Sequence, residues 1–306
     1  MGDVLEVREL RKEYRRWRRG KTVAVDGLDL TIPTGGVYGF LGPNGSGKTT
    51  TIRCLLGLAR PTAGSCRVLG VDSQHELHKV INKVGSIVET PAFFPRFSGR
   101  RNLDLLARIY GLKGTKVDEV LETVGLSTRA RDRVRTYSLG MRQRLGIAAA
   151  LLKDPSVLIL DEPANGLDPA GIKETRELLR RLGSEGRTVF LSSHILSEIS
   201  QTCERVAILS RGRLVAAGGV DEILSGARPQ GFVVRVPDPA AAIQVLERAS
   251  IDATRNGELL RVSLPPDEGG RITKALADAG IYVTELRPEE VDLETVFLEL
   301  TREPPG

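Results

Sequence analysis

One loop limits the fold more than any other feature of the chain. Residues 39–51 read GFLGPNGSGKTTT and contain the pattern G-x-x-x-x-G-K-T, from Gly42 to Thr49. The apolar residues 37–41 before the loop predict a buried strand, and residues 49–58 predict the start of a helix. Glycines let such a loop turn tightly, so that its N–H groups and the helix N-terminus surround an anion. The stretch therefore predicts an α/β domain with a phosphate-binding loop.

Two residues at the end of this loop have the chemistry of a nucleotide site. Lys48 is expected to reach the β- and γ-phosphates, and the Thr49 hydroxyl is expected to ligate Mg²⁺. A glycine-rich turn that binds nothing is the alternative. The order of strand, loop and helix argues against that alternative.

A second buried strand ends in two adjacent carboxylates. Residues 157–163 read VLILDEP, and the four apolar residues predict a strand buried on both faces. Asp161 and Glu162 follow it, at the edge where open α/β sheets bind ligands. Burying two acids is costly unless they face a cation or a reacting water. We expect Asp161 to bind Mg²⁺ through water and Glu162 to be the general base for an attacking water.

A third strand is predicted within residues 187–196, RTVFLSSHIL, and a helical pattern between the two strands completes a βαβ unit. His194 stands at the end of this strand, next to the carboxylate strand. A structural histidine is the alternative, but the position favours a contact to a γ-phosphate.

The stretch YSLGMRQRLGIAAALL, residues 137–152, predicts a long helix with a second anion site at its start. Ser138 is a favoured N-cap, and a helix start with Ser138 and Gly140 suits an anion. One nucleotide rarely needs two such helix starts from one chain. Two chains facing each other in antiparallel fashion would use both, in an isologous twofold arrangement.

The order of these motifs resembles the ATP-binding subunit of an ABC transporter. After the loop come YSLGMRQ, LILDEP, NGLDP and LSSH, and the resemblance covers residues 3 to about 225. It implies that ATP and Mg²⁺ bind between two copies of the chain, a homodimer, and that a separate polytopic transmembrane subunit is the other partner. The implied catalytic residues are Glu162 and His194. The implied metal ligands are Thr49, Glu89 and Asp161. The implied nucleotide contacts are Tyr14, Gly42, Pro43, Asn44, Gly45, Ser46, Gly47, Lys48, Thr49, Thr50, Glu89, Ser138, Gly140 and Asp168.

Three of these residues take their roles from the resemblance alone. Tyr14 matches the aromatic that stacks on adenine, with packing in an N-terminal antiparallel sheet as the alternative. Glu89 falls where the family usually has a glutamine that links Mg²⁺ and the water to the transmembrane partner. Asp168 matches the loop that contacts the other subunit.

The chain also departs from the common family pattern. The family signature is usually LSGGQ, whereas residues 137–141 read YSLGM; the residues that hold phosphate in the family, Ser138 and Gly140, are kept. Glu89 replaces an amide with an acid. Both departures resemble the branch of exporters for drugs and peptide antibiotics, such as bacitracin-type and lantibiotic-immunity systems.

The resemblance and the residue patterns together predict two domains. Residues 1–225 are expected to form a P-loop NTPase core of ABC type, with an N-terminal antiparallel β subdomain and a helical subdomain at about 88–154. Residues 226–306 are expected to form a small α+β accessory domain, with an amphipathic helix at 293–301.

Charge and aromatic content bear on the partners. The chain has a net charge of +5, and basic residues cluster at 11–21 and 129–135. Solvated loops, a polyanion or an anionic membrane face could explain these clusters. Aromatic residues make up only 4% of the chain, which argues against base stacking along a strand. The apolar stretch at 145–152 is far shorter than the ~18 to 20 residues that span a bilayer. We expect no nucleic-acid partner and a peripheral location at the cytoplasmic face of the cell membrane.

An aromatic segment follows Glu89. Residues 90–101 read TPAFFPRFSGRR, and their two prolines interrupt any helix. Phe93, Phe94 and Phe97 therefore need another partner. Arginines flank the three rings, as in a binding site with an aromatic centre and a charged rim. Internal packing is the alternative. In the family that the chain resembles, this region receives a short cytoplasmic helix of the transmembrane subunit.

We predict an ATP-hydrolysing subunit that powers a separate transmembrane exporter of a drug, antibiotic or other amphiphile. The alternative is a soluble ABC-type ATPase that acts on nucleic acid or ribosomes. The segment between Gly42 and Ser138 is too short for the coiled coils of repair ATPases, and the single phosphate loop differs from the two of translation-type members. A nucleotide-gated scaffold without turnover is a third possibility, against which Glu162 and His194 argue.

Overall fold

The computed structural model describes residues 2–16, 20–89, 92–226 and 231–288. The chain divides into two compact units, and the boundary lies between Val220 and Asp221. Each unit has its own sheet and its own buried core, so each is described by itself.

A six-stranded sheet forms the centre of the first unit, in the order β10-β9-β3-β8-β7-β6. Neighbouring strands are parallel except for β10, which pairs antiparallel with β9. Strands β7 and β8 are buried at every residue, as expected for parallel strands covered on both faces. All three predicted core strands are present. The strands are β3 (Gly36–Leu41), β6 (Val84–Ile87), β7 (Val157–Leu160), β8 (Thr188–Ser193), β9 (Arg205–Ser210) and β10 (Arg213–Gly219).

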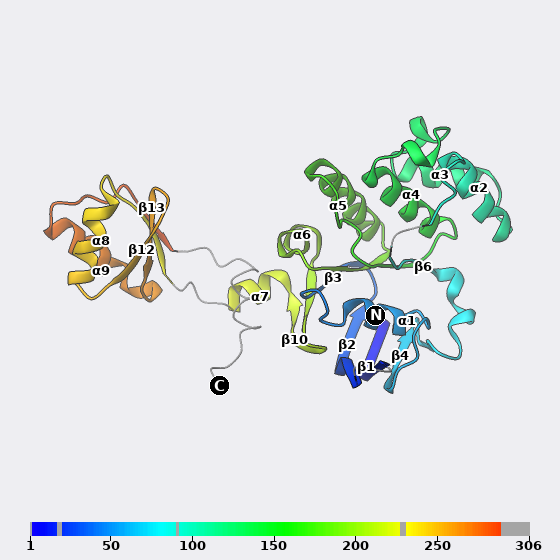
Figure 1. Cartoon of the computed structure of the whole chain (residues 1–306), viewed down its shortest axis with the longest axis horizontal. Coiled ribbons are helices and arrows are strands. Elements are labelled where there is room, and N and C mark those ends of the chain that lie inside the picture. The colour runs from blue at the N-terminus through cyan, green and yellow to red at the C-terminus, as the bar shows by residue number, and fades with distance from the viewer. Residues whose placement is uncertain (1, 17–19, 90–91, 227–230, 289–306) are drawn as a thin grey trace. The chain divides into compact units, whose positions relative to one another are not determined.

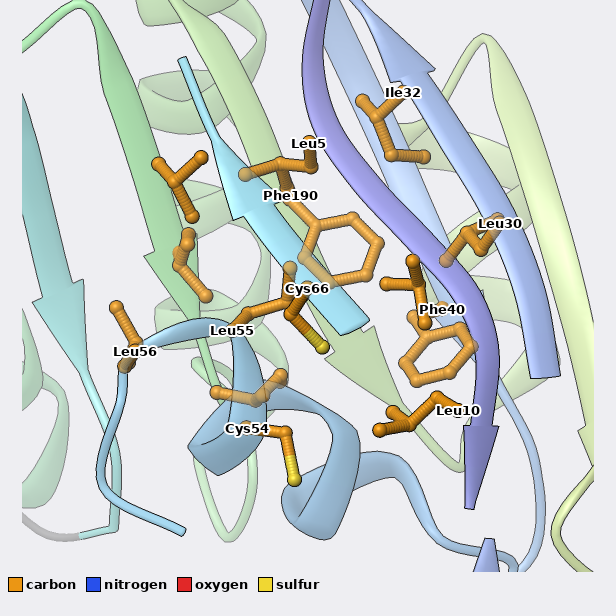
Figure 2. Close-up of a cluster of buried hydrophobic side chains, with 14 of the residues drawn as sticks. Leu5, Leu10, Leu30, Ile32, Phe40, Cys54, Leu55, Leu56, Cys66 and Phe190 are labelled. Atoms are coloured by element: carbon orange, nitrogen blue, oxygen red, sulfur yellow. The ribbon is translucent and has the colours of Figure 1, made fainter. Parts of the chain in front are cut away.

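A four-stranded antiparallel sheet, in the order β2-β1-β4-β5, lies on one side of the central sheet, and helix α1 lies between the two (Figure 1). Figure 2 shows the core at this junction, with Leu5, Leu10 and Leu30 of the antiparallel sheet beside Phe40 and Phe190. The two phenylalanine rings, from β3 and β8, have centroids 5.4 Å apart. The strands are β1 (Asp3–Arg16), β2 (Gly20–Pro33), β4 (Ala63–Val68) and β5 (Val71–Asp72).

Helices cover the other side of the central sheet and extend into a helical region (Figure 1). Helices α2, α3 and α4 pack on one another, in agreement with the predicted helical subdomain. The helix predicted from residue 49 to 58 is shorter than expected and ends at Leu55, because Gly57 takes a positive φ of 68°. The helices are α1 (Lys48–Leu55), α2 (Gly99–Ile109), α3 (Thr115–Thr123), α4 (Leu139–Leu151), α5 (Pro169–Ser184), α6 (Leu196–Thr202) and α7 (Val220–Gly226), with 3₁₀ turns η1 (Leu77–Lys79), η2 (Ile81–Lys83), η3 (Ser127–Arg129) and η4 (Val134–Thr136).

The second unit has the element order β-α-β-β-α-β, the split βαβ arrangement. Its antiparallel sheet has the order β12-β13-β11-β14, and a separate core forms around Phe232, Val234 and Leu260. The predicted α+β character is confirmed, while the predicted helix at 293–301 lies outside the described residues. The elements are β11 (Phe232–Arg235), α8 (Pro239–Arg248), β12 (Asp252–Asn256), β13 (Leu259–Ser263), η5 (Pro266–Glu268), α9 (Gly269–Asp278) and β14 (Glu285–Pro288).

Candidate nucleotide site

The predicted phosphate-binding loop connects β3 to α1. A Cβ atom at Gly42 would lie 2.4 Å from the Leu209 carbonyl oxygen, and one at Gly47 would lie 2.4 Å from the Ala24 carbonyl oxygen. Gly47 also has a φ of 109° and precedes α1 without a side-chain cap. Only glycine fits this path at both positions, and the path leaves the first N–H groups of α1 free of a capping side chain.

Lys48 is held inside the loop, and its side chain is only 5% exposed. Its Nζ donates to the carbonyl oxygen of Gly42 at 2.6 Å and to that of Pro43 at 3.3 Å. The same Nζ lies 3.2 Å from Oε1 of Glu162. The charge of this buried ammonium is therefore compensated both by the loop and by the carboxylate that follows β7.

Glu162 joins two predicted site residues through its two carboxylate oxygens. One oxygen contacts Lys48, and the other lies 2.8 Å from Nδ1 of His194, which follows β8. An ionised carboxylate only accepts hydrogen bonds, so Nδ1 carries the proton in this contact. Glu162 has a positive φ of 49°, a backbone conformation that few non-glycine residues adopt. Glu162 is thus in direct contact with both Lys48 and His194, although the three residues are far apart in the sequence.

Ser192 connects the carboxylate of Asp161 to the backbone of Glu162 and was not among the residues predicted from the sequence. Its Oγ donates to Oδ1 of Asp161 at 2.5 Å and accepts from the backbone N–H of Glu162 at 2.9 Å. Asp161 is buried, and its own N–H donates to the carbonyl of Ile87 in β6 at 2.8 Å. Two adjacent serines at the end of a buried strand were the only sequence signal for this contact.

The loop has the donors that a bound phosphate needs. Ser46 Oγ is buried and has no hydrogen-bond partner among the described residues. A buried hydroxyl without a partner costs free energy, and a phosphate oxygen would satisfy it. Together with Lys48 and the uncapped start of α1, it fits a triphosphate.

The predicted metal ligands suit Mg²⁺ rather than a metal held by protein alone. Thr49 in the first turn of α1 and buried Asp161 offer oxygen donors. In the described part of the chain, no cluster of three or more His, Cys, Asp or Glu residues could hold a metal ion. Mg²⁺ commonly binds one or two protein oxygens together with phosphates and water, so these residues fit such an ion when a nucleotide is present.

The structure does not bring Glu89 to the loop. Its side chain is 66% exposed and forms an ion pair with Arg53 of α1. Glu89 also has a positive φ of 67°. Arg53 stands four residues after Thr49, on the same face of α1, so Glu89 lies about one helical turn beyond the predicted metal ligand.

Ser138 and Asp168 each cap the helix that they precede. Ser138 Oγ accepts the N–H of Met141 at 3.2 Å at the start of α4, and Asp168 Oδ1 accepts the N–H of Gly171 at 3.3 Å at the start of α5. A Cβ at Gly140 would lie 3.9 Å from Gly171, so these two helix starts adjoin. Ser138 was predicted as an N-cap, and this prediction is confirmed. Within the described residues, no hydrogen bond or ion pair links Ser138 or Asp168 to the phosphate-binding loop.

Tyr14 lies on β1 opposite Thr22 of β2, and its half-buried ring lies under Lys12 Nζ at 4.9 Å from the ring centroid. The same strand β2 carries Ala24, whose carbonyl approaches Gly47 of the loop. Tyr14 is therefore on the strand next to the one that contacts the phosphate-binding loop.

A groove lies beside the aromatic segment. It has a volume of about 550 Å³ and is lined by residues of β6, α2 and α4 together with Phe93. Phe94 is 61% exposed and packs on Phe97 with ring centroids 5.3 Å apart. The Arg101 guanidinium lies 5.1 Å from the centroid of the Phe97 ring. The lining of the groove includes neither the Phe94 ring nor the residues around Lys48.

The loop between β3 and α1, on a parallel sheet with carboxylates at the ends of its strands, defines a P-loop nucleotide-binding core. The family model described as ABC transporter matches residues 25–165. Over 306 residues the chain is 43% identical to YhcH of Bacillus subtilis (strain 168), an uncharacterized ABC transporter ATP-binding protein, with 99% of this chain and 97% of YhcH covered. It is 39% identical over 301 residues to BcrA of Enterococcus faecalis, a bacitracin transport ATP-binding protein, with 97% of this chain and 96% of BcrA covered.

A solved dimer of an ATP-binding cassette in a post-hydrolysis state, bound to ADP and Pi, has the same fold. The TM-score is 0.63 at 24% identity, over 70% of this chain and 98% of that chain. The chain therefore belongs to the ABC transporter family of ATP-binding subunits, and it is an ATPase of that class. The alternative of an ATPase acting on nucleic acid or ribosomes is not supported. In the described residues, no helix combines the length and the apolar character needed to cross a membrane.

Proposed function

We propose that this chain supplies ATP hydrolysis to an exporter of a drug or peptide antibiotic. It would act as a homodimer, bound to a separate polytopic transmembrane subunit at the cytoplasmic face of the cell membrane. The relation to the bacitracin transport protein BcrA supports this cargo class, because it extends over 97% of this chain. The observation that carries the chemistry is the carboxylate of Glu162, which contacts both Lys48 and His194.

In this proposal, the three contacting residues divide the work of hydrolysis. Lys48 provides the positive charge for the β- and γ-phosphates, and Glu162 accepts the proton of the attacking water. His194 orients Glu162 through the 2.8 Å contact and provides a further group for the γ-phosphate. Thr49 and Asp161 would hold Mg²⁺, which neutralises charge on the phosphates when it is bound. Ser192 fixes the carboxylate of Asp161 and the backbone of Glu162 together.

The second copy of the chain is proposed to complete the site. The start of α4 at Ser138 is exposed, and its capped helix end suits an anion. Ser138 and Gly140 adjoin the Asp168 loop and lack a contact to the phosphate loop of their own chain within the described residues. Both features support binding of the partner copy's nucleotide, with Asp168 near the same interface.

The groove beside Phe93 is proposed to receive the transmembrane subunit. A groove of about 550 Å³ lined by Phe93, the exposed Phe94 ring that follows it in the chain, and Arg101 over the Phe97 ring combine an aromatic anchor with a charged group. Glu89 and the groove are close in sequence, and Glu89 is tied by Arg53 to the helix that starts at the phosphate loop. A movement of α1 would therefore reach the groove through a short connection.

A double variant tests this coupling surface. Phe94→Ser with Phe97→Ser should leave ATP hydrolysis by the isolated chain within about twofold of the parent. Co-purification with a polytopic membrane protein, and stimulation of ATPase activity by that protein, should fall by at least ~10-fold, as expected when interface anchors are removed.

Ile109→Ser is the control, because Ile109 is apolar, 76% exposed on α2 and, unlike Phe94 and Phe97, lies outside the aromatic segment. It should change neither quantity. If the isolated double variant instead loses its ATPase activity while still binding the membrane protein, the two rings belong to the core and the coupling surface lies elsewhere.

A further inference from the structure

A carboxyl group on α6 reaches back to the end of strand β8. Glu198 lies in the first turn of α6 and accepts a hydrogen bond from Ser193 Oγ at 3.0 Å. The same hydroxyl accepts the N–H of Ile195 at 3.0 Å. Ser193 is almost completely buried, so these two contacts fix its side chain.

Ser193 connects Glu198 to the phosphate-binding loop and to His194. Its carbonyl oxygen accepts the N–H of Gly42, the first glycine of the phosphate-binding loop, at 3.3 Å. The next residue in the chain is His194, which contacts Glu162. The position of one serine therefore sets the loop and the histidine relative to each other.

Glu198 has an environment that a residue needed only to start a helix would not require. Its Oε1 is buried without a hydrogen-bond partner among the described residues, an arrangement that costs free energy. Burial raises the pKa of its carboxyl group, the hydrogen bond from Ser193 opposes this rise, and the negative charge of nearby Glu162 adds to it. Glu198 thus stands close to the site in electrostatic terms as well as through Ser193.

We propose that Glu198 is a positioning residue for ATP hydrolysis, which acts through Ser193 to hold the Gly42 end of the phosphate loop and His194 in one fixed arrangement. This inference rests on the proposed roles of Lys48, Glu162 and His194. It predicts that loss of the Ser193–Glu198 hydrogen bond impairs the groups around the γ-phosphate and leaves the rest of nucleotide binding unchanged.

The test compares Glu198→Ala, Glu198→Gln and Ser193→Ala in the full chain. We expect kcat to fall by ~10-fold for Glu198→Ala, because the catalytic groups would be displaced by a fraction of an ångström. Glu198→Gln keeps an oxygen that accepts from Ser193, so its kcat should stay within about twofold of the parent. Ser193→Ala should match Glu198→Ala, and the double variant should lose no more than either one. Ser200→Ala, at an exposed position on the same helix, is the control and should behave as the parent.

A second readout does not require turnover. Thermal melts with ATP and with ADP should show that Glu198→Ala loses the extra stabilisation that ATP gives over ADP, while the shift by ADP remains. This readout separates the inference from the proposed function. The parent protein could fail to hydrolyse ATP and still show the difference in stabilisation between ATP and ADP, so the effect of Glu198→Ala on that difference can be tested either way. The inference is overturned if Glu198→Ala retains parental kcat and the full ATP-over-ADP difference, or if Glu198→Gln is as impaired as Glu198→Ala.

Discussion

Two helix starts in the first unit, at α1 and at α4, have opposite arrangements. Gly47 precedes α1 and provides no side chain to cap it. Ser138 precedes α4 and caps it with its own hydroxyl, at 3.2 Å from the N–H of Met141. The first helix start is surrounded by Lys48, Glu162 and His194 of the same chain, whereas the second faces outward.

The difference shows how one chain can hold two unequal halves of a site. Around α1, donors, a cation and a carboxylate converge, and Ser46 Oγ still lacks a partner among the described residues. Around α4, the Ser138 hydroxyl already satisfies one N–H of the helix end, that of Met141. This difference agrees with the proposal that the α1 side carries the chemistry and the α4 side adds one contact to a ligand held by the other copy.

The largest expected effect comes from the base on the α1 side. Glu162→Gln should keep ATP affinity and lower kcat by roughly 10²- to 10⁴-fold, because a positioned general base contributes about that much. Steady-state ATPase assays measure kcat, and a melt with ATP measures binding.

Glu177→Gln is the control, since Glu177 lies on α5 with its side chain 64% exposed. It should keep the parental rate. A Glu162→Gln variant that hydrolyses ATP at the parental rate would remove Glu162 as the base and with it the assignment of the chemistry to the α1 side.

The next effect tests whether the α4 side serves a second chain. Chains with Lys48→Ala or Ser138→Arg alone should be inactive, since each lacks one half of every site. Mixed in equal amounts, they should recover a fraction of parental ATPase activity, because one composite site in each heterodimer has an intact loop and an intact Ser138.

Lys48→Ala also serves as a binding control. ATP at about 100 times its Kd should stabilise the parent by ~2.7 kcal/mol if it binds only the folded chain, and the variant should lose this shift. Complete inactivity of the mixture at every ratio, with heterodimers shown to form, would mean that the two helix starts do not share a nucleotide.

The smallest expected effect concerns Glu89, which pairs with Arg53 about one helical turn beyond Thr49 on α1. Its ion pair with Arg53 is largely exposed, so Glu89→Gln should change the free energy of unfolding by less than about 1 kcal/mol. ATP binding should be kept, and the dependence of turnover on Mg²⁺ concentration should weaken, because a carboxylate attracts the ion more strongly than an amide does.

Arg53→Gln separates the two possible causes, because it removes the same ion pair and leaves the acid. Superimposable Mg²⁺ titrations of the parent and Glu89→Gln would exclude a role of Glu89 toward the metal. An identical change in both variants would assign the effect to the ion pair alone.

The predictable parts of the structure were those encoded by local patterns. The loop from Gly42 to Thr49, the apolar strand before Asp161 and the N-cap at Ser138 each depend on residues close in sequence. Their elements are present as predicted, with α1 ending earlier because of the backbone at Gly57.

The parts that could not be predicted depend on contacts between distant segments. Ser192 bridges Asp161 and Glu162, and Arg53 holds Glu89 away from the loop. The spacing of apolar residues along the sequence does not predict such pairs, because they form only when β7, β8 and α1 are assembled. The family resemblance suggested where Glu89 would act, but the exposed guanidinium of a neighbouring helix decided where its side chain lies.

The capping bond of Ser138 has a consequence for how often two chains can meet and separate. Because the hydroxyl already satisfies a backbone N–H of its own helix, parting of the subunits leaves no unmet backbone group at that position. The surface stays folded in the single chain, and no local refolding is needed before the next encounter. In the proposed dimer, association at this surface would therefore not cost the refolding of this helix end in each cycle.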